Sequence, residues 1–191
     1  MLAAQHLPKE LLLIMGSPSL SAMTGFERKL VVGVGGMAVS NNQNMVLTTY
    51  SLGSCLGITI YDPVSRTGGL LHAMLPDSSI NADKAREQPA MFVDTGVSAL
   101  FRAAYELHAQ KHRVQICVVG GAQFLDKSGF FNIGQRNYDS LVKLMDQHGL
   151  TIQAKVVGGL VSRTVHLRLG TGEVRLKTSG DTEEETLFKG C

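Results

Sequence analysis

One cysteine of the chain lies in a sequence context where a thiol could act as a nucleophile. Cys55 stands in the run YSLGSCLG (50–57), at the predicted bend between two strands. The small residues Gly53, Ser54 and Gly57 let backbone and substrate approach closely, and backbone N–H groups beside the thiol could stabilise an oxyanion. Free cysteine is also among the most frequently buried residue types, so these residues alone leave a core role open.

A nucleophilic thiol needs a base, and His72 is the candidate. It interrupts the otherwise apolar run GGLLHAML (68–75). A neutral imidazole near a thiol can accept its proton, which gives a thiolate–imidazolium pair that is nucleophilic near neutral pH. The alternative is a core histidine that hydrogen-bonds to the backbone. His166 also lies in a predicted strand and stays a second candidate base, whereas three others lie on or near predicted helices: His108, His112 and His148.

The other chemical signals in the chain are weaker. Cys117 lies within the apolar run ICVV and is predicted to pack in the core, and Cys191 is the last residue. Glycine-rich segments at 32–36 and 118–122 follow predicted strands, but neither completes GxGxxG and no GxxxxGK[ST] occurs, so we predict tight turns. The aspartates are too dispersed for a metal site or a paired-carboxylate glycosidase site.

The composition fits one folded domain. The 191 residues are 44% apolar and 18% charged, with a net charge of +2, and a domain of this size buries about 70% of its surface on folding. Such weak basicity, without tryptophan, gives no footprint for nucleic acid. No stretch approaches the roughly 20 apolar residues of a membrane span. Three scattered cysteines favour a reducing, cytoplasmic location over a disulfide scaffold.

The elements that must position Cys55 and His72 are strands and two main helices. The predicted strands cover residues 30–34, 45–50, 56–61, 68–75, 114–119, 151–157, 164–169 and 174–177. Pro89 begins a predicted helix over 89–109, and Gly149 ends another over 135–148.

The segments outside these elements are predicted to be tails and loops. Residues 1–27 are expected as a loosely ordered tail with room for one helical turn, and a secretory leader is the alternative. Residues 76–88 are an expected exposed loop, and 179–191 an expected polar C-terminal tail. The domain would then span 28–178.

Several motifs, taken in order, resemble the CheD family of chemoreceptor glutamine deamidases. They are LGSC (52–55), HAMLPDS (72–78), VVGGAQFL (118–125), IGQRN (133–137) and VVGGLVSRTVHL (156–167). The resemblance covers about residues 30–177. It implies an α/β fold with a single domain: a three-layer mixed α/β sandwich with two main helices.

The resemblance also implies a Cys–His–Thr site. By motif, the nucleophile falls on Cys55, the base on His72, and the third member, which orients the base, on Thr49. Backbone N–H groups near Ser54 and Cys55 would hold the oxyanion, and the backbone of Gly53 would form part of the same cleft. Further positions at the substrate cleft would be Gln123, Phe124 and Ser78. No metal or organic cofactor is implied.

The implied activity is conversion of glutamine side chains of methyl-accepting chemotaxis receptors to glutamate, with a CheC-type phosphatase as a further partner. Two departures from the family pattern bear on substrate preference. Gly36 stands where GxGE has its acidic residue, and the usual TLGLGSC appears as TTYSLGSC, so Tyr50 and Ser51 are expected to alter the rim of the cleft. Arg136 and Asn137 can cap a helix or anchor a loop as readily as contact substrate.

Two other classes of function stay open. One is a regulatory binding module that docks a CheC-type phosphatase or a receptor with little turnover. The other is a cysteine peptidase or small-molecule amidase that uses the same pair of residues. The presence of Cys55, His72 and Thr49 together favours catalysis, because a pure binding module need not keep all three.

Overall fold

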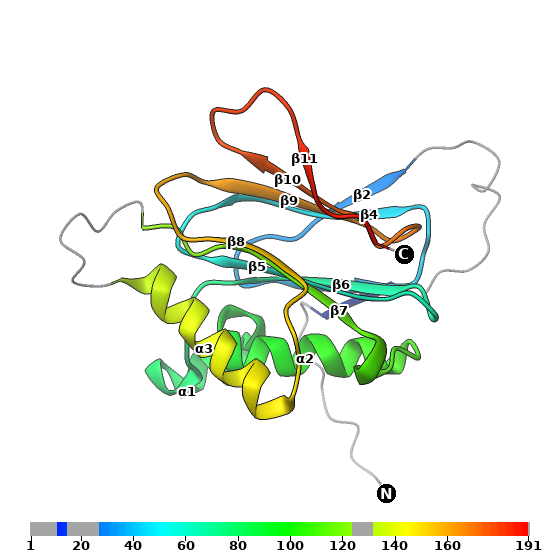
Figure 1. Cartoon of the computed structure of the whole chain (residues 1–191). Helices are drawn as coiled ribbons and strands as arrows, with labels where there is room; N and C mark the ends of the chain where they lie inside the picture. The colour runs from blue at the N-terminus through cyan, green and yellow to red at the C-terminus, as the bar shows by residue number, and fades with distance from the viewer. Residues whose placement is uncertain (1–10, 15–26, 124–131, 191) are drawn as a thin grey trace, which may run out of the picture.

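The computed structural model, described for residues 11–14, 27–123 and 132–190, folds into three stacked layers (Figure 1). Helices form one outer layer, a six-stranded sheet lies in the middle, and a five-stranded sheet forms the other outer layer. The three-layer mixed α/β sandwich predicted from the resemblance is therefore confirmed. Within the described residues, no helix combines the length and apolar character needed to cross a bilayer.

The six-stranded sheet has the order β1-β3-β6-β5-β7-β8. Its central strands are buried along their whole length, because helices cover one face and the second sheet covers the other. The strands are β1 (Leu11–Ile14), β3 (Met37–Ser40), β5 (Leu56–Asp62), β6 (Thr67–Ala73), β7 (Gln115–Gly120) and β8 (Ala154–Val157).

The five-stranded sheet has the order β11-β10-β9-β4-β2. It contains β2 (Arg28–Val31), β4 (Met45–Leu52), β9 (Arg163–Arg168), β10 (Val174–Thr178) and β11 (Glu185–Phe188). The chain leaves this sheet at the end of β4 and enters the six-stranded sheet at β5. Residues 53–55, which include Cys55, form that crossing between the layers.

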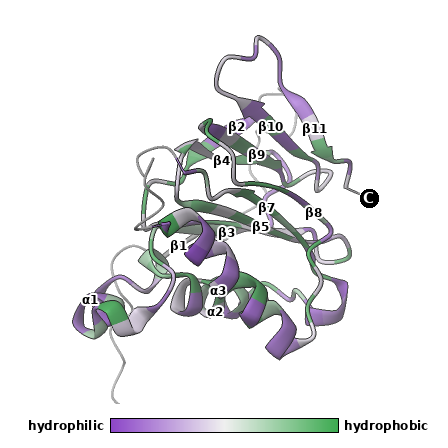
Figure 2. Ribbon diagram, turned by 60° about the vertical axis from the view of Figure 1, so that its left-hand side comes forward, coloured by the Kyte–Doolittle hydropathy of each residue, from purple (hydrophilic) through white to green (hydrophobic). Residues whose placement is uncertain are grey.

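The helical layer is built by α1 (Ala82–Glu87), α2 (Val93–Glu106) and α3 (Ile133–His148). Single 3₁₀ turns occur at Ser78–Ile80, Pro89–Met91 and Lys111–Arg113. The predicted helix over 89–109 is thus a 3₁₀ turn that begins at Pro89, followed by α2. Gly149 adopts φ 58° directly after α3, so the predicted stop is confirmed. Hydrophilic residues mark the outward parts of the helices, and hydrophobic residues the central strands (Figure 2).

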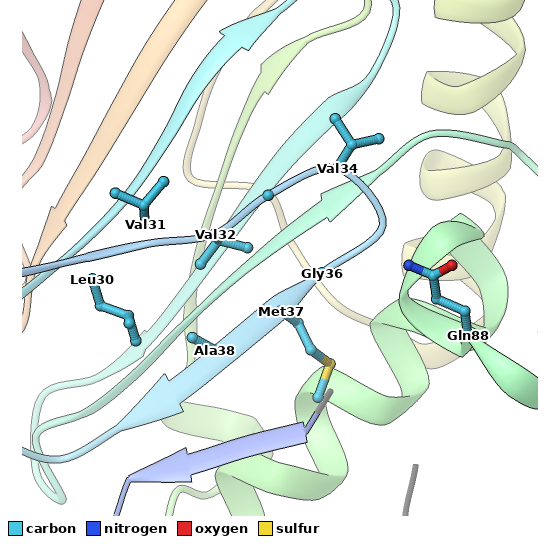
Figure 3. Close-up of a pocket in the computed structure, with 9 residues that line it drawn as sticks. Leu30, Val31, Val32, Val34, Gly36, Met37, Ala38 and Gln88 are labelled. Atoms are coloured by element: carbon cyan, nitrogen blue, oxygen red, sulfur yellow. The ribbon is translucent and has the colours of Figure 1, made fainter. Parts of the chain in front are cut away.

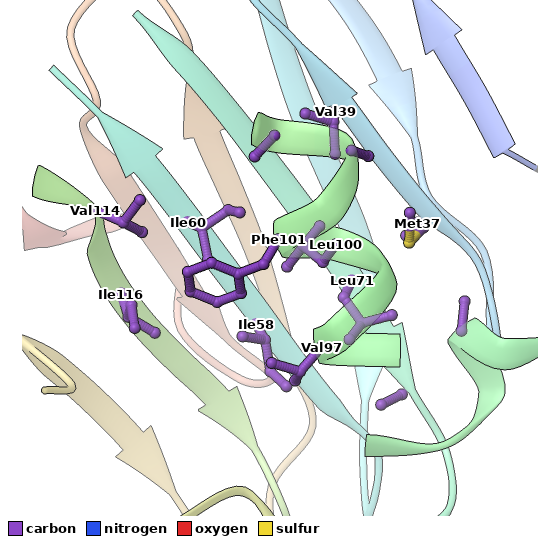
Figure 4. Packing of buried hydrophobic residues seen from close by; sticks show 14 of the residues in the cluster. Met37, Val39, Ile58, Ile60, Leu71, Val97, Leu100, Phe101, Val114 and Ile116 are labelled. Atoms are coloured by element: carbon purple, nitrogen blue, oxygen red, sulfur yellow. The ribbon is translucent and has the colours of Figure 1, made fainter. Parts of the chain in front are cut away.

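Two apolar cores hold the layers together. Between the helices and the six-stranded sheet, α2 contributes Val97, Leu100 and Phe101 (Figure 4). These side chains cover residues from alternate positions of β5 and β6: Ile58, Ile60 and Leu71. The intervening positions, such as Leu70, point to the other core, between the two sheets. His72 has the same parity as Leu70, so its side chain enters the layer between the sheets.

Four elements lie where the sequence analysis expected none. Leu11–Ile14 pairs as β1 with β3 in the segment assigned to a tail, and β11 pairs with β10 in the expected C-terminal tail. The short strand β3 was missed because it follows directly on a glycine-rich turn. The expected loop 76–88 is wrong at α1, where the Asn81 side chain accepts a hydrogen bond from the Lys84 amide and caps a helix too short to show periodicity.

A β-bulge distorts β4 just before the crossing. Thr49 pairs with Val165, but Leu52 pairs with Arg163, so β4 has one more residue than β9 across this interval. The exposed residue Ser51 adopts φ 56° there, a left-handed conformation that favours glycine. Counted back from the cysteine, the first glycine of the family's TLGLGSC falls on this position. The departure noted in the sequence therefore places a side chain on strained backbone.

Replacing Ser51 by glycine should stabilise the protein. The side chain is exposed, so Ser51→Gly should raise the free energy of unfolding by roughly 0.5–1 kcal/mol, because relief of the left-handed strain outweighs the entropy that glycine adds to the unfolded chain. Urea unfolding measures this change. Ser51→Ala is the matched control: it keeps the Cβ and should give no gain. Equal stability of the two variants would contradict the assigned strain.

Candidate active site

The crossing loop is held by its carbonyl groups. Ala122 N–H donates to the Gly53 carbonyl (2.8 Å) and Gly121 N–H donates to the Cys55 carbonyl (2.9 Å). Between them, Asn137 Nδ2 of α3 donates to the Ser54 carbonyl (2.9 Å). Three consecutive peptide oxygens are thus fixed by the end of β7 and by α3.

This anchoring also sets the direction of the loop's N–H groups. In a planar trans peptide the N–H points opposite to the carbonyl of the preceding residue. The Gly53 and Ser54 carbonyls therefore direct the N–H groups of Ser54 and Cys55 away from β7 and α3. Backbone N–H groups beside a thiol that are not used by the protein can stabilise charge that develops on a carbonyl attacked by the sulfur.

Glycine is required where β7 meets this loop. Gly120 adopts φ 114°, and a Cβ at this position would lie 2.2 Å from the Cys55 carbonyl oxygen. Gly121 adopts φ 63° and donates to that same oxygen. The glycine pair at 120–121, which the sequence analysis assigned to a tight turn, is therefore part of the support of Cys55.

Thr49 and His72 form a hydrogen-bonded pair across the two sheets. Thr49 Oγ1 lies 2.7 Å from His72 Nδ1 and also donates to the Val32 carbonyl at 2.7 Å. Because the hydroxyl proton is used on Val32, the hydroxyl oxygen must accept from Nδ1–H. This fixes the tautomer of His72: Nδ1 carries the proton, and Nε2 is left as the acceptor.

Cys55 lies on the same side of the six-stranded sheet as His72. Gly57 is paired directly with His72 in the β5–β6 ladder, and Cys55 precedes Gly57 by two residues, in the crossing just before β5. Cys55 packs against the core between the sheets and is half-buried, whereas His72 is 2% exposed. Nε2 has no hydrogen-bond partner among the described residues, Cys55 included.

Burial favours the neutral forms of both groups. It raises the pKa of the Cys55 thiol, and the smaller opposing effect comes from the Cys55 backbone N–H. Burial likewise lowers the pKa of His72 to about 4, against the smaller effect of the Val32 carbonyl. The thiolate–imidazolium pair expected from the sequence is therefore not favoured at rest. A neutral His72 is instead ready to act as a base when the thiol attacks.

His166, the other candidate base, belongs to a different cluster. Its Nδ1 lies 2.8 Å from Thr48 Oγ1 and its Nε2 lies 3.3 Å from a Glu184 carboxylate oxygen. Adjacent residues of a strand point to opposite faces, so Thr48 and Thr49 direct their hydroxyls to opposite sides of β4. His166 thus lies on the outer side of the five-stranded sheet, with both ring nitrogens engaged.

Cys117 is a core residue, as predicted. It is 2% exposed and packs between the two sheets. Burial raises the pKa of its thiol to about 11. Such a thiol is poorly reactive near neutral pH.

The hydrogen bonds given for the further cleft candidates are to residues other than Cys55 and His72. Ser78 is bound to Asp94 in the first turn of α2, through its hydroxyl (2.6 Å) and its amide. Gln123 donates from Nε2 to Asn132 Oδ1 (2.6 Å), and its amide bonds to the Gly159 carbonyl. Phe124 lies outside the described residues. A role of these positions in binding substrate stays a prediction.

Two groups that support the site could not be assigned this role from the sequence. Asn137 was considered for capping or loop anchoring, and the structure shows it anchoring the Ser54 carbonyl. The IGQRN motif was the available signal for it. The Val32 carbonyl, which orients Thr49, left no signal, because a backbone oxygen occurs at every residue.

A cavity of about 290 Å³ is lined by residues of β2, β3 and the turn between them, together with Gln88 (Figure 3). The turn between β2 and β3 forms one wall of the cavity. The same turn holds the backbone of His72 through two hydrogen bonds: Gly35 N–H donates to the His72 carbonyl, and His72 N–H donates to the Gly36 carbonyl. Gln88 Nε2 in turn donates to the Gly35 carbonyl (3.2 Å). The turn predicted at 32–36 therefore holds the base rather than a nucleotide.

Within the described residues, no group of histidine, cysteine and acidic side chains is arranged to hold a metal ion.

The neutral resting pair predicts how Cys55 reacts with pH. Because its thiol pKa is raised and His72 stays neutral down to about 4, little thiolate exists below neutrality. Alkylation by iodoacetamide, followed on the Cys55 peptide by mass spectrometry, should rise about tenfold per pH unit up to the thiol pKa. A rate already at its plateau below pH about 7 would instead show a thiolate–imidazolium pair.

Comparison with known proteins gives the family of this chain. A family model described as "CheD chemotactic sensory transduction" matches residues 74–178. A relative from Syntrophus aciditrophicus, named probable chemoreceptor glutamine deamidase CheD 1, is 46% identical over 151 residues, which cover 79% of this chain and 94% of the relative. Relatives named probable chemoreceptor glutamine deamidase CheD from Solibacter usitatus and Pyrococcus abyssi are 41% and 40% identical, over 82% and 78% of this chain and 92% and 91% of their own length. With such identity over most of its length, this chain is a member of the CheD family.

Proposed function

We propose that this protein is a protein-glutamine deamidase that acts on chemoreceptors in chemotaxis. The names of its relatives support the reaction and the class of substrate. The observation that carries the proposal is the Thr49–His72 pair: it leaves Nε2 unprotonated and without a partner among the described residues, in the layer between the sheets against which Cys55 also packs.

The first half of the reaction forms a thioester. Cys55 Sγ attacks the carboxamide carbon of a substrate glutamine while its proton passes to His72 Nε2. The oxygen of the tetrahedral intermediate is held by the N–H groups of Ser54 and Cys55, and one such donor is worth about 3–4 kcal/mol in other enzymes. The carbon–nitrogen bond then breaks, and the Nε2 proton leaves with the amine as ammonia. A γ-glutamyl thioester on Cys55 remains.

Water completes the turnover. Neutral His72 accepts a proton from a water molecule whose oxygen attacks the thioester carbon. The carbon–sulfur bond breaks, sulfur regains the proton from Nε2, and glutamate is released. Throughout, Thr49 accepts a hydrogen bond from Nδ1–H, so Nε2 stays the nitrogen that exchanges protons, as the third group of a triad requires.

The outcome on the receptor is electrostatic. Each turnover replaces a neutral amide by a carboxylate, and like charges at neighbouring positions of helices repel. Tyr50 directly follows Thr49, and Met74 comes two residues after His72; both are large and exposed, at 45% and 41%. These side chains are suited to contact the apolar part of a receptor helix. Docking to a CheC-type phosphatase stays a prediction.

The direct test is deamidation of a glutamine-bearing cytoplasmic receptor fragment. Wild-type protein should convert glutamine to glutamate, detected by mass spectrometry and by release of ammonia, and Cys55→Ala should abolish both. Cys117→Ala is the matched control: it removes a buried thiol, so it should lower stability but keep turnover per folded molecule. Cleavage of the peptide chain would show a peptidase. Receptor or phosphatase binding without conversion would show a docking module.

The role of Thr49 can be separated from its burial. Thr49→Val keeps the shape but removes the acceptor of Nδ1–H, so kcat should fall about 10- to 100-fold, the range expected for one hydrogen bond in a buried network. Thr48→Val is the matched control on the adjacent residue, which is equally buried but bonded to His166. It should lower stability and leave kcat unchanged. Equal loss of kcat in both variants would remove Thr49 from the mechanism.

A further inference from the structure

One buried side chain joins the loop of the nucleophile to the strand of the base. Asn137 lies in α3, in the layer of helices, and is 0% exposed. Its Nδ2 donates to the Ser54 carbonyl at 2.9 Å and to the Met74 carbonyl at 3.0 Å. Ser54 immediately precedes Cys55, and Met74 follows His72 by two residues. Both N–H bonds of one amide thus tie together the two segments that carry the reacting groups.

The orientation of this amide is determined by its partners. Both contacts of Nδ2 are to carbonyl oxygens, which only accept, so the flipped amide would place oxygen against oxygen twice. The remaining atom, Oδ1, is buried and has no hydrogen-bond partner among the described residues. An unpaired buried acceptor is unfavourable. The two N–H bonds of Asn137 are thus used on the two carbonyls, and its oxygen adds nothing to them.

The hydrogen bond to the Ser54 carbonyl also orients the Cys55 N–H, because both groups belong to one peptide plane. The Ser54 carbonyl and the Cys55 N–H belong to the same rigid unit and point in opposite directions. Asn137 therefore fixes the direction of the Cys55 N–H, which the proposed reaction uses for the oxyanion. The start of α3 is itself seated tightly, since a Cβ on Gly134 would lie 2.4 Å from the Gly121 carbonyl oxygen.

We propose that Asn137 is a positioning residue, which sets the geometry of the oxyanion donor and holds the loop of Cys55 against the strand of His72. This inference rests on the deamidase function proposed above. A group that acts on the oxyanion matters mainly in the transition state, because the charge develops only there. Loss of Asn137 should therefore lower kcat and leave KM nearly unchanged.

The test compares Asn137→Leu, which has the same branching and no donor, with Leu141→Ala. Leu141 is one turn further along α3, is also 0% exposed, and touches neither loop through a hydrogen bond. Asn137→Leu should lower kcat about 10- to 100-fold, somewhat less than complete removal of an oxyanion donor, with KM within about threefold. The rate of Cys55 alkylation at fixed pH should also change several-fold, because the loop that carries the thiol loses one of its three anchors. Leu141→Ala should lower the melting temperature but keep both kcat per folded molecule and the alkylation rate.

Three results would overturn the proposal. One is a folded Asn137→Leu variant with wild-type kcat and alkylation. Another is a Leu141→Ala variant that loses kcat per folded molecule, in the same proportion to its loss of stability as Asn137→Leu does. If Asn137→Leu does not fold, Asn137→Ala, which removes the donor and adds no volume, takes its place. Failure of both to fold while Leu141→Ala folds would assign Asn137 to stability alone.

These outcomes are distinguishable from failure of the proposed function. If the wild-type protein alkylates at Cys55 but converts no receptor glutamine, the deamidase proposal fails. The alkylation comparison between Asn137→Leu and Leu141→Ala still reports whether Asn137 positions the thiol. If the wild type deamidates and both variants match it, only the positioning role fails.

Discussion

The hydroxyl of Thr49 is the point at which the two sheets and the chemistry meet. It donates to the carbonyl of Val32 and accepts from Nδ1 of His72, so one oxygen connects β4, the residue after β2, and β6. A hydroxyl that bonded only to His72 could rotate and let the ring change its tautomer. The second bond prevents this, because the hydroxyl proton is already committed. The strand pairing of two sheets therefore determines which nitrogen of the imidazole is left to accept a proton.

The nucleophile depends on the same layered arrangement in another way. Cys55 is one of the three residues that take the chain from one sheet to the other. The backbone of these residues is not paired with a neighbouring strand. The carbonyls of this crossing are instead held by Gly121, Ala122 and Asn137, from β7's end and from α3. Each layer thus supplies one part of the site: the outer sheet Thr49, the middle sheet His72, and the helices the anchor of the loop.

Much of this arrangement was predictable from the sequence, and the remainder was not, for physical reasons. Cys55 and His72 were identified as candidates from a thiol among small residues and an imidazole in an apolar strand, but core roles for both stayed open until the resemblance selected them. The strand alternation of Leu70, Leu71 and His72 gives the face of the base, whereas Thr49 came only through the resemblance. The neutral forms that burial favours in both groups could not be predicted, because that burial depends on the second sheet and is invisible in local sequence. The short elements β1, β3, β11 and α1 are specified by pairing and capping rather than by periodicity.

The burial of His72 also links folding to protons. In the unfolded chain an imidazole binds a proton with a pKa near 6.5, whereas in the folded protein burial lowers the pKa of His72 to about 4. Between these values the unfolded chain holds a proton that the folded one lacks, so the free energy of unfolding falls as the solution is acidified, by up to about 3 kcal/mol from this group. The uncharged base that readies the site for attack is thus also a source of acid lability in the fold that houses it.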